Sequence, residues 1–353
     1  MRFTDRLGLT LPLIQAPMAG VSTPALAAAV CEAGALGSIA IGATDVASAR
    51  TMIADVRART DRAFNVNVFV HRPAHADPVR EAHWLDLLRP LFAEFRVEPP
   101  PALRTIYTSF ADDADMLAML VDTAPPVVSF HFGIPPADTL DALRARGVFM
   151  LATATSVDEA IAIEAAGIDA IGAQGIEAGG HRGMFEPQAP DAAMSTLALT
   201  ETLAKTTHLP IIAAGGIMDG AGIAAALDRG AAGVQLGTAF IACPESAADE
   251  AYRAAVSGLS ADTTILTSVI SGRPARAIPN RFTALDTGSN IPPDYPRAYD
   301  AGKALHAAAK ATGENGFGAH WAGQGAPFAR SLPAAELIAA LKAELEACRE
   351  QQS

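Results

Sequence analysis

Residues 210–240 read PIIAAGGIMDGAGIAAALDRGAAGVQLGTAF. Two short apolar runs, Pro210–Ala214 and Gly233–Gly237, flank an alanine-rich stretch, Gly220–Arg229. Near-continuous apolar runs of this length predict parallel strands that are buried on both faces. The stretch between them predicts a helix, and Gly230 directly after it is the expected helix stop. The segment therefore predicts one strand–helix–strand unit.

The same unit recurs along the chain. Apolar runs predict eight strands, near Pro12–Pro17, Leu36–Ile41, Ala63–Val68, Val127–Phe132, Val148–Ala152, Ala170–Gln174, Pro210–Ala214 and Gly233–Gly237. The intervening stretches predict helices at Thr23–Ala33, Val46–Arg59, Pro78–Arg96, Asp112–Asp122, Ala137–Arg146, Val157–Ala166, Thr196–Thr206 and Gly220–Arg229. Eight such units favour an α/β fold, a closed (β/α)8 TIM barrel. An open doubly wound sheet is the alternative, but no GxGxxG motif follows the first strand.

The pattern changes after the eighth strand. Residues 244–319 contain helical pieces at Ala247–Val256 and Pro296–Thr312 and predict a smaller, mainly helical cap inserted at the strand-end face. The barrel then comprises residues 1–243 and 320–353, and its eighth helix is Ala334–Arg349.

Composition limits the partners. Half of the 353 residues are apolar, and the formal net charge of -12 argues against nucleic acid or an anionic membrane as a partner. The three cysteines show no CxxC spacing, which excludes a thiolate zinc site and suits a reducing compartment. No apolar stretch approaches the ~20 residues of a membrane span. We expect a cytoplasmic protein without a metal site, and a homodimer stays open.

A β/α barrel carries its reactive groups at the C-terminal ends of the strands. After the sixth predicted strand comes Gln174–Gly183, in which glycines flank His181 on both sides. Glycine lets the backbone approach a ligand closely, and an imidazole there can serve as a general base or a hydrogen-bond donor. The alternative is a histidine that only ties down the loop. We take His181 as the candidate catalytic residue.

Two further loops predict a phosphate site. Gly215 and Gly216 follow the seventh strand, and Gly237 and Thr238 follow the eighth. Barrels commonly bind phosphate between these two loops, where amide groups turn inward. This signal does not separate FMN from a sugar phosphate. Met18, in the turn after the first strand, suits a flat ring lying on the backbone or, equally, plain core packing.

Other side chains are expected near the same face. Asn67 and His131 lie near the ends of the third and fourth strands and would point into the barrel mouth. The alternative for His131 is a histidine whose hydrogen bonds only support the barrel. The four tyrosines are Tyr107, Tyr252, Tyr295 and Tyr299, and the cap segment near two of them also carries Lys303. They could line the entrance to a pocket, although ordinary packing explains the tyrosines equally well. By contrast, the basic pair Arg273 and Arg276 is expected to be solvated or salt-bridged.

Together these segments resemble the nitronate monooxygenase family, formerly called 2-nitropropane dioxygenases, in its class I branch. The resemblance covers nearly the whole chain. It rests on the blocks Pro12–Ser22, Gln174–Gly183, Ala213–Gly222 with Gly233–Phe240, and Trp321–Gly325. The Gly-Gly-His-Arg-Gly stretch and the Trp-Ala-Gly-Gln-Gly block are its most specific parts.

The resemblance implies non-covalently bound FMN and a role for each predicted residue. His181 would be the catalytic base or would orient the substrate, and His131, Tyr107, Tyr299 and Lys303 would shape the substrate pocket. The cofactor-binding residues would be Met18, Asn67, Gln174, Gly179, Gly180, Gly215, Gly216, Gln235, Leu236, Gly237 and Thr238. Such enzymes oxidise alkyl nitronates, notably propionate 3-nitronate, with dioxygen through a flavin semiquinone. The products are a carbonyl compound and nitrite or nitrate.

Two other functions stay open on this barrel. An FMN-dependent reductase could use NAD(P)H to reduce a quinone or an enoyl thioester. A flavin-free lyase or isomerase could act on a phosphorylated substrate. The four lysines all lie outside the predicted strands, which disfavours a Schiff-base enzyme of the latter kind. A non-catalytic binding module is least expected, because the polar groups converge on one face.

Overall fold

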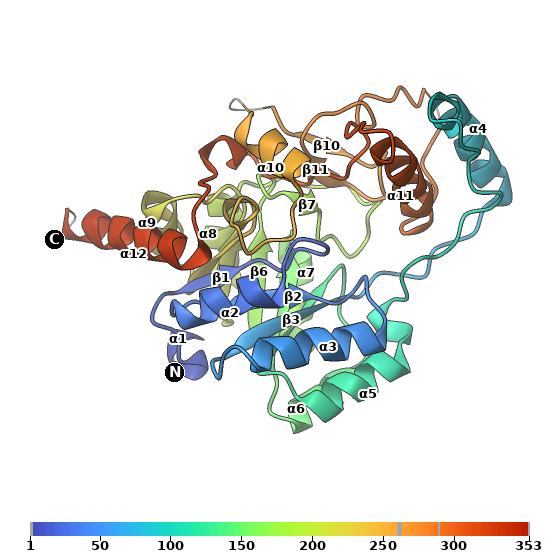
Figure 1. Ribbon diagram of the computed structural model, residues 1–353. Coiled ribbons are helices and arrows are strands. Elements are labelled where there is room, and N and C mark those ends of the chain that lie inside the picture. Colours follow the sequence, from blue (N-terminus) through green and yellow to red (C-terminus); the bar gives the residue numbers. More distant parts are fainter. Residues whose placement is uncertain (1–2, 260–262, 289, 352–353) are drawn as a thin grey trace.

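The computed structural model describes residues 3–259, 263–288 and 290–351. Its main sheet has eight parallel strands in the order β1-β9-β8-β6-β5-β4-β3-β2, and a bridge from Ile14 to Leu36 brings its two ends together as a barrel (Figure 1). The strands are β1 (Leu13–Gln15), β2 (Gly37–Ala40), β3 (Phe64–Phe69), β4 (Val127–His131), β5 (Phe149–Ala154), β6 (Ala170–Gln174), β8 (Ile211–Ala214) and β9 (Gly233–Leu236). The predicted TIM barrel is confirmed.

A ring of helices surrounds the barrel. Its members are α2 (Pro24–Glu32), α3 (Val46–Arg57), α5 (Ala114–Thr123), α6 (Ala137–Ala145), α7 (Val157–Ala165), α8 (Thr196–Thr206), α9 (Gly220–Asp228) and α12 (Ala334–Glu350). The C-terminal helix α12 packs against α9 and α2 and so closes the ring, as the sequence predicted.

Strand β3 shows how the sequence sorts side chains between the two faces of the barrel wall. Its residues alternate, because successive side chains of a strand point to opposite faces. Phe64, Val66 and Val68 belong to the apolar cluster that also contains residues of α3 and α5. Asn65 and Asn67 therefore face the barrel interior, where both are buried.

The far end of the barrel is filled by apolar side chains. Phe3 of α1 (Phe3–Leu7) packs on Phe149 of β5, in a cluster that also contains Ile14 and Leu36. The interior at that end is a packed core, and the opening lies at the C-terminal ends of the strands.

Above that opening lies a second group of elements. It comprises α10 (Glu250–Ser257), α11 (Arg297–Lys310) and a small sheet of β10 (Ile265–Thr267), β11 (Ala275–Ala277) and β7 (Gly180–His181). Single 3₁₀ turns are η1 (Phe110–Asp112), η2 (Thr238–Phe240) and η3 (Ala326–Phe328). The sequence did not indicate the small sheet, because its strands are only two or three residues long.

Helix α4 (Pro78–Glu94) lies with this second group, beside α11 (Figure 1). Its side chains Trp84 and Phe92 share an apolar cluster with Leu305 and Phe317. The sequence placed this helix in the alternation between the third and fourth strands, but α5 alone covers the barrel there. The division into a barrel of residues 1–243 and 320–353 and a cap of residues 244–319 stays a prediction. Its residues 1–2, 260–262, 289, 352 and 353 lie outside the described part.

No helix in the described ranges combines the length and the apolar character that crossing a membrane requires.

Candidate active site

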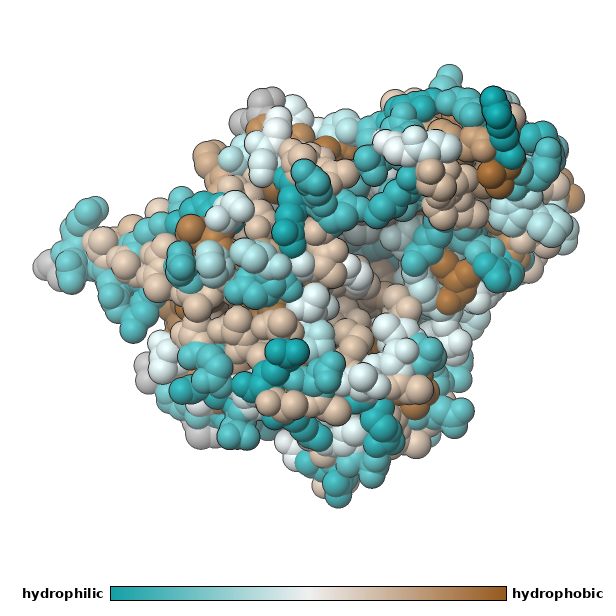
Figure 2. Space-filling model, in the orientation of Figure 1, coloured by the Kyte–Doolittle hydropathy of each residue, from teal (hydrophilic) through white to brown (hydrophobic). Residues whose placement is uncertain are grey.

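A cavity of about 380 Å³ opens at the C-terminal ends of the barrel strands, beneath the capping elements. In Figure 2 the surface is hollowed between the barrel and the part of the molecule that carries α4 and α11. All sixteen predicted site residues line the cavity: Met18, Asn67, Tyr107, His131, Gln174, Gly179, Gly180, His181, Gly215, Gly216, Gln235, Leu236, Gly237, Thr238, Tyr299 and Lys303. The structure thus brings together every residue that the sequence assigned to the site.

The loop after β8 has a backbone that only glycine accommodates well. Gly215 and Gly216 have φ angles of 130° and 71°. A Cβ on Gly215 would lie 2.6 Å from Thr196 Oγ1. The N–H groups of Gly216 and of Thr238, in the loop after β9, have no acceptor among the described residues. Both are available to a ligand with phosphate-like oxygens.

The loop after β6 is held by polar contacts at both ends. Arg182 is only 1% exposed, and its Nε lies 2.7 Å from Asp191 Oδ2 while its Nη1 donates to the carbonyl of Gly175 at 2.9 Å. Gln174 Nε2 donates to the carbonyl of His181 at 3.0 Å, and its Oε1 accepts from the N–H of Gly183 at 2.8 Å. These bonds fix the position of His181 over the cavity.

A close backbone contact holds the same loop against the end of the chain. A Cβ on Gly179 would lie 2.4 Å from the backbone nitrogen of Gly323. The N–H of Gly323 donates to Thr238 Oγ1 at 3.0 Å. The Trp321–Gly325 block noted in the sequence therefore joins the loops after β6 and β9.

His131 has both ring nitrogens occupied. Its Nε2 lies 3.2 Å from the carbonyl oxygen of His181, and because a carbonyl only accepts, Nε2 carries the hydrogen. Its Nδ1 lies 3.0 Å from Thr153 Oγ1, which donates to it. His131 lines the cavity, but it supports the backbone of His181 and has no nitrogen left for a substrate.

His181 has one free ring nitrogen. Its Nε2 lies 2.9 Å from Ser271 Oγ. Its Nδ1 has no partner among the described residues and is not one of their buried unpaired atoms, in contrast to Nε2 of His71. Nδ1 is therefore open to the cavity.

Both histidines are neutral at ordinary pH. Burial, with the nearby Arg273 guanidinium, lowers the pKa of His181 to about 3 and that of His131 to about 4. A neutral imidazole with a free nitrogen can accept a proton.

An aromatic cage surrounds the His181 ring. The ring centroid lies 4.9 Å from that of Trp321, 5.4 Å from that of Tyr295, 5.7 Å from that of Phe132 and 6.1 Å from that of Tyr299. These rings exclude water from most of the imidazole, which is the physical cause of its low pKa.

The cap supplies the cavity's one cation. Among the described lining residues, Lys303 of α11 is the only lysine or arginine, and no aspartate or glutamate accompanies it. Its Nζ lies 5.4 Å from the ring centre of Tyr107 and 5.5 Å from that of Tyr299. Burial raises the pKa of both tyrosines to about 12, so both phenols can donate hydrogen bonds at neutral pH. The lining therefore favours an anionic ligand.

The prediction for Arg273 and Arg276 was wrong. Arg273 is 2% and Arg276 is 7% exposed, and neither makes an ion pair within the described part of the chain. Arg276 donates to the carbonyl of Ile176 at 2.9 Å, and Arg273 donates to the carbonyls of Arg182 and Met184. These carbonyls belong to residues 176–184, which lie 89 to 100 residues earlier in the chain, and a composition pattern could not reveal such contacts.

Sequence reasoning missed several lining residues. Phe132 and Thr153 line the cavity without having been assigned to it, and Tyr252 and Tyr295, which the sequence left between an entrance and ordinary packing, line it as well. Phe132 directly follows His131 at the end of β4, and its position alone could have indicated it.

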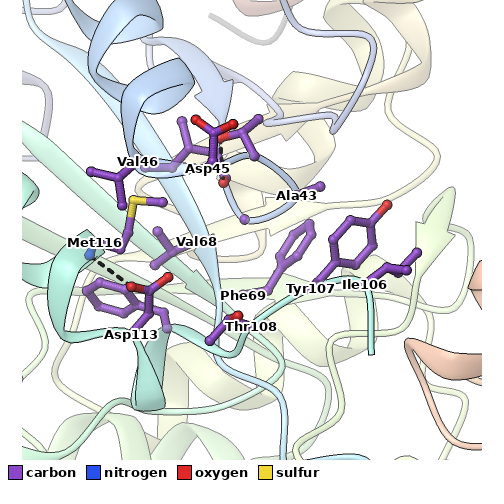
Figure 3. A pocket seen from close by; sticks show the side chains of 14 residues that line it. Ala43, Asp45, Val46, Val68, Phe69, Ile106, Tyr107, Thr108, Asp113 and Met116 are labelled. Atoms are coloured by element: carbon purple, nitrogen blue, oxygen red, sulfur yellow. Dashed lines mark hydrogen bonds between the residues drawn. The ribbon is translucent and has the colours of Figure 1, made fainter. Parts of the chain in front are cut away.

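A second cavity of about 360 Å³ adjoins the first. The two share Ala43, Thr44, Phe69 and Tyr107 in their walls. Figure 3 shows the rings of Phe69 and Tyr107 side by side at one end of this cavity, with Met116 and Asp113 at the other. The two rings therefore form part of the wall between the cavities.

No group of three or more histidine, cysteine, aspartate or glutamate side chains in the described ranges is arranged to hold a metal ion.

Comparison with known proteins agrees with this geometry. The profile of the family described as nitronate monooxygenase matches residues 2–344. A nitronate monooxygenase of Paraburkholderia phytofirmans is 59% identical over 98% of this chain and 95% of its own length. One of Pseudomonas aeruginosa is 58% identical over 98% of this chain and 99% of its own.

Solved structures give the same result. A nitroalkane oxidase from Streptomyces ansochromogenes superposes with a TM-score of 0.90 at 40% identity, over 99% of both chains. FabK from Thermotoga maritima superposes with a TM-score of 0.76 at 28% identity, over 99% of this chain and 97% of its own.

Proposed function

The chain belongs to the nitronate monooxygenase family, an oxidoreductase family of flavoenzymes, and from this we propose that it uses FMN to oxidise alkyl nitronates such as propionate 3-nitronate with dioxygen. The products would be a carbonyl compound and nitrite or nitrate. One observation carries the proposal: the glycine loops after β6, β8 and β9 and the free Nδ1 of His181 meet in a single cavity.

The residues of the cavity fit FMN. The N–H groups of Gly216 and Thr238 would bind its phosphate, because they have no acceptor in the part of the chain that the structure describes. The other residues proposed to hold the cofactor are Met18, Asn67, Gln174, Gly179, Gly180, Gly215, Gln235, Leu236 and Gly237. When bound, FMN supplies the electron acceptor, while the protein positions the reactants.

The substrate would lie on the His181 side of the cavity. A nitronate carries negative charge on two oxygens, and Lys303 with the phenols of Tyr107 and Tyr299 would bind it. For a neutral nitroalkane, His181 would first accept the proton from the α-carbon. His131 would keep the backbone of His181 in place through its carbonyl.

An oxygen-electrode assay with propionate 3-nitronate and FMN-loaded enzyme tests the proposal. We expect oxygen uptake with formation of nitrite or nitrate, and no uptake by protein freed of flavin. Purified protein that stays colourless and binds no FMN would contradict the proposal and favour the flavin-free alternative.

Anaerobic mixing with NADH separates the oxygenase from the reductase. We expect the flavin to keep its yellow colour. Rapid bleaching, without oxygen uptake on a nitronate, would instead identify an NAD(P)H-dependent reductase.

A further inference from the structure

Ser271 contacts the imidazole of His181 from the side opposite its free nitrogen. The serine is fully buried, and its Oγ lies 2.9 Å from His181 Nε2. The same Oγ donates to the carbonyl of Arg273 at 3.2 Å and accepts from the N–H of Arg273 at 3.4 Å. Three hydrogen bonds therefore meet at one hydroxyl.

These three bonds can coexist in only one arrangement. A serine hydroxyl has one hydrogen and two lone pairs. Its hydrogen goes to the carbonyl of Arg273, and one lone pair accepts from the N–H of Arg273. The other lone pair must then accept from His181, so Nε2 carries the hydrogen. In the reverse arrangement, the buried carbonyl of Arg273 would lose its only partner among the described residues, which is unfavourable.

The serine is held firmly because Arg273 is anchored on two sides. The Arg273 guanidinium lies 4.1 Å from the ring centre of Phe132, and it donates to the carbonyls of Arg182 and Met184. Two residues further on, Ala275 of β11 pairs with His181 of β7. The segment that bears Ser271 thus connects β10 to β11, and β11 pairs with the strand that bears the imidazole.

We propose that Ser271 is a positioning residue that keeps His181 in the Nε2–H tautomer and thereby presents Nδ1 to the substrate as the proton acceptor. This inference rests on the proposed function and goes beyond it, because it makes the use of neutral nitroalkanes depend on a residue of the cap.

The proton transfer balances without any redox step. The Cα–H bond of the nitroalkane breaks, its electron pair stays with the substrate as the nitronate, and the proton joins Nδ1. The imidazolium that results still donates from Nε2 to Ser271, so the same contact serves both charge states. A nitronate that arrives already deprotonated needs no such acceptor.

The tautomer can be read directly by NMR of protein labelled with ¹⁵N in its histidines. Long-range couplings from the ring carbons distinguish Nε2–H from Nδ1–H, and comparison with His181→Asn assigns the signal. We expect His181 to be wholly Nε2–H in the parent protein. Ser271→Ala should give a measurable Nδ1–H fraction. The matched control is Ser268→Ala, whose hydroxyl lies in the same segment and makes no hydrogen bond in the described chain.

Kinetics supply a second readout. In Ser271→Ala we expect kcat/KM for nitroethane to fall about tenfold or more, while kcat/KM for its nitronate changes less than about threefold. Ser268→Ala should match the parent with both substrates. If Ser271→Ala does not fold, Ser271→Cys keeps the size and weakens the hydrogen bond, and should show smaller changes in the same direction.

An Nδ1–H signal for His181 in the parent, or a Ser271→Ala variant with parental tautomer and parental kinetics, overturns the inference. Failure of the proposed function looks different. In that case the parent enzyme takes up no oxygen with any nitronate, while the NMR spectrum still reports the tautomer.

Discussion

Two histidines line the cavity, and their hydrogen bonds give them different abilities to move a proton. His131 uses both nitrogens, one toward Thr153 and one toward the carbonyl of His181. His181 keeps Nδ1 free within an aromatic cage. At the scale of single residues, therefore, we propose that proton transfer depends on His181 alone of these two.

Replacing that side chain separates proton transfer from oxidation. His181→Asn should keep FMN bound and the protein yellow, because the asparagine leaves the glycine loops untouched. Its kcat/KM for nitroethane should fall by about 10²-fold, the usual contribution of a general base, while nitronate oxidation falls much less. Steady-state oxygen uptake with both substrates measures this. Equal activity of variant and parent on nitroethane would remove His181 from the role.

The loop glycines allow a test with matched backbones. Gly216 and Gly147 have φ angles of 71° and 73°, but only Gly216 lines the cavity. Alanine at either site should lower the free energy of unfolding by a similar ~1–2 kcal/mol, because a residue with a Cβ is strained in the left-handed backbone conformation. Gly216→Ala should also weaken FMN binding by about tenfold or more, because a Cβ 3.1 Å from Glu177 Cβ displaces the loop. Fluorescence titration with FMN measures this, and equal affinities of the two variants would contradict the phosphate site.

At the scale of elements, the segment from β7 to α8 contains a largely buried ion pair. Arg182 and Asp191 have side chains 1% and 19% exposed. Removing the carboxylate leaves a buried guanidinium without its counter-charge, which is far less favourable than losing a surface pair.

Asp191→Ala should lower the free energy of unfolding by about 3 kcal/mol. The control is Asp122→Ala, which breaks the ion pair between Asp122 and Arg50. Because the Arg50 side chain is 50% and the Asp122 side chain 67% exposed, this change should lower the free energy of unfolding by less than about 1 kcal/mol. Urea unfolding of both variants gives the comparison. If the two losses were equal, Arg182 would not depend on Asp191 for its charge balance.

Helix α4 shows where local patterns fail at this scale. Its N-cap is an aspartate, as in α3 and α5, and its start at Pro78 was predicted correctly. Its apolar face, however, meets α11 and not the barrel wall. Whether the apolar face of α4 packs on the barrel wall or on α11 depends on which of the two the folded chain places beside it.

For the whole molecule, the buried histidines link stability to pH. The pKa values of His131 and His181 are about 4 and about 3, against about 6.5 in an unfolded chain. Below pH 6.5 the unfolded chain therefore binds more protons than the folded one. The stabilisation is complete above pH 6.5 and is lost as the pH falls toward the folded values.

The free energy of unfolding of the flavin-free protein should fall between pH 6 and pH 4.5 by about 1.4 kcal/mol per pH unit for each of these two histidines. A variant with both His131→Gln and His181→Asn should show a correspondingly shallower slope over that range. Urea unfolding at several pH values measures it. Identical slopes for variant and parent would show that neither histidine is held neutral by folding.

Much of this protein followed from its sequence alone. Strand and helix periodicity predicted the barrel, because within a strand or a helix the side chains that face the core recur at a fixed spacing. Glycines at strand ends predicted the site, since Gly215, Gly216 and Gly180 stand where the backbone takes positive φ angles. The contacts of Ser271 and Arg273 with the His181 loop appeared only in the tertiary structure. The physical reason is that a local pattern reports whether a side chain is buried, whereas its hydrogen-bond partner comes from a segment about ninety residues away.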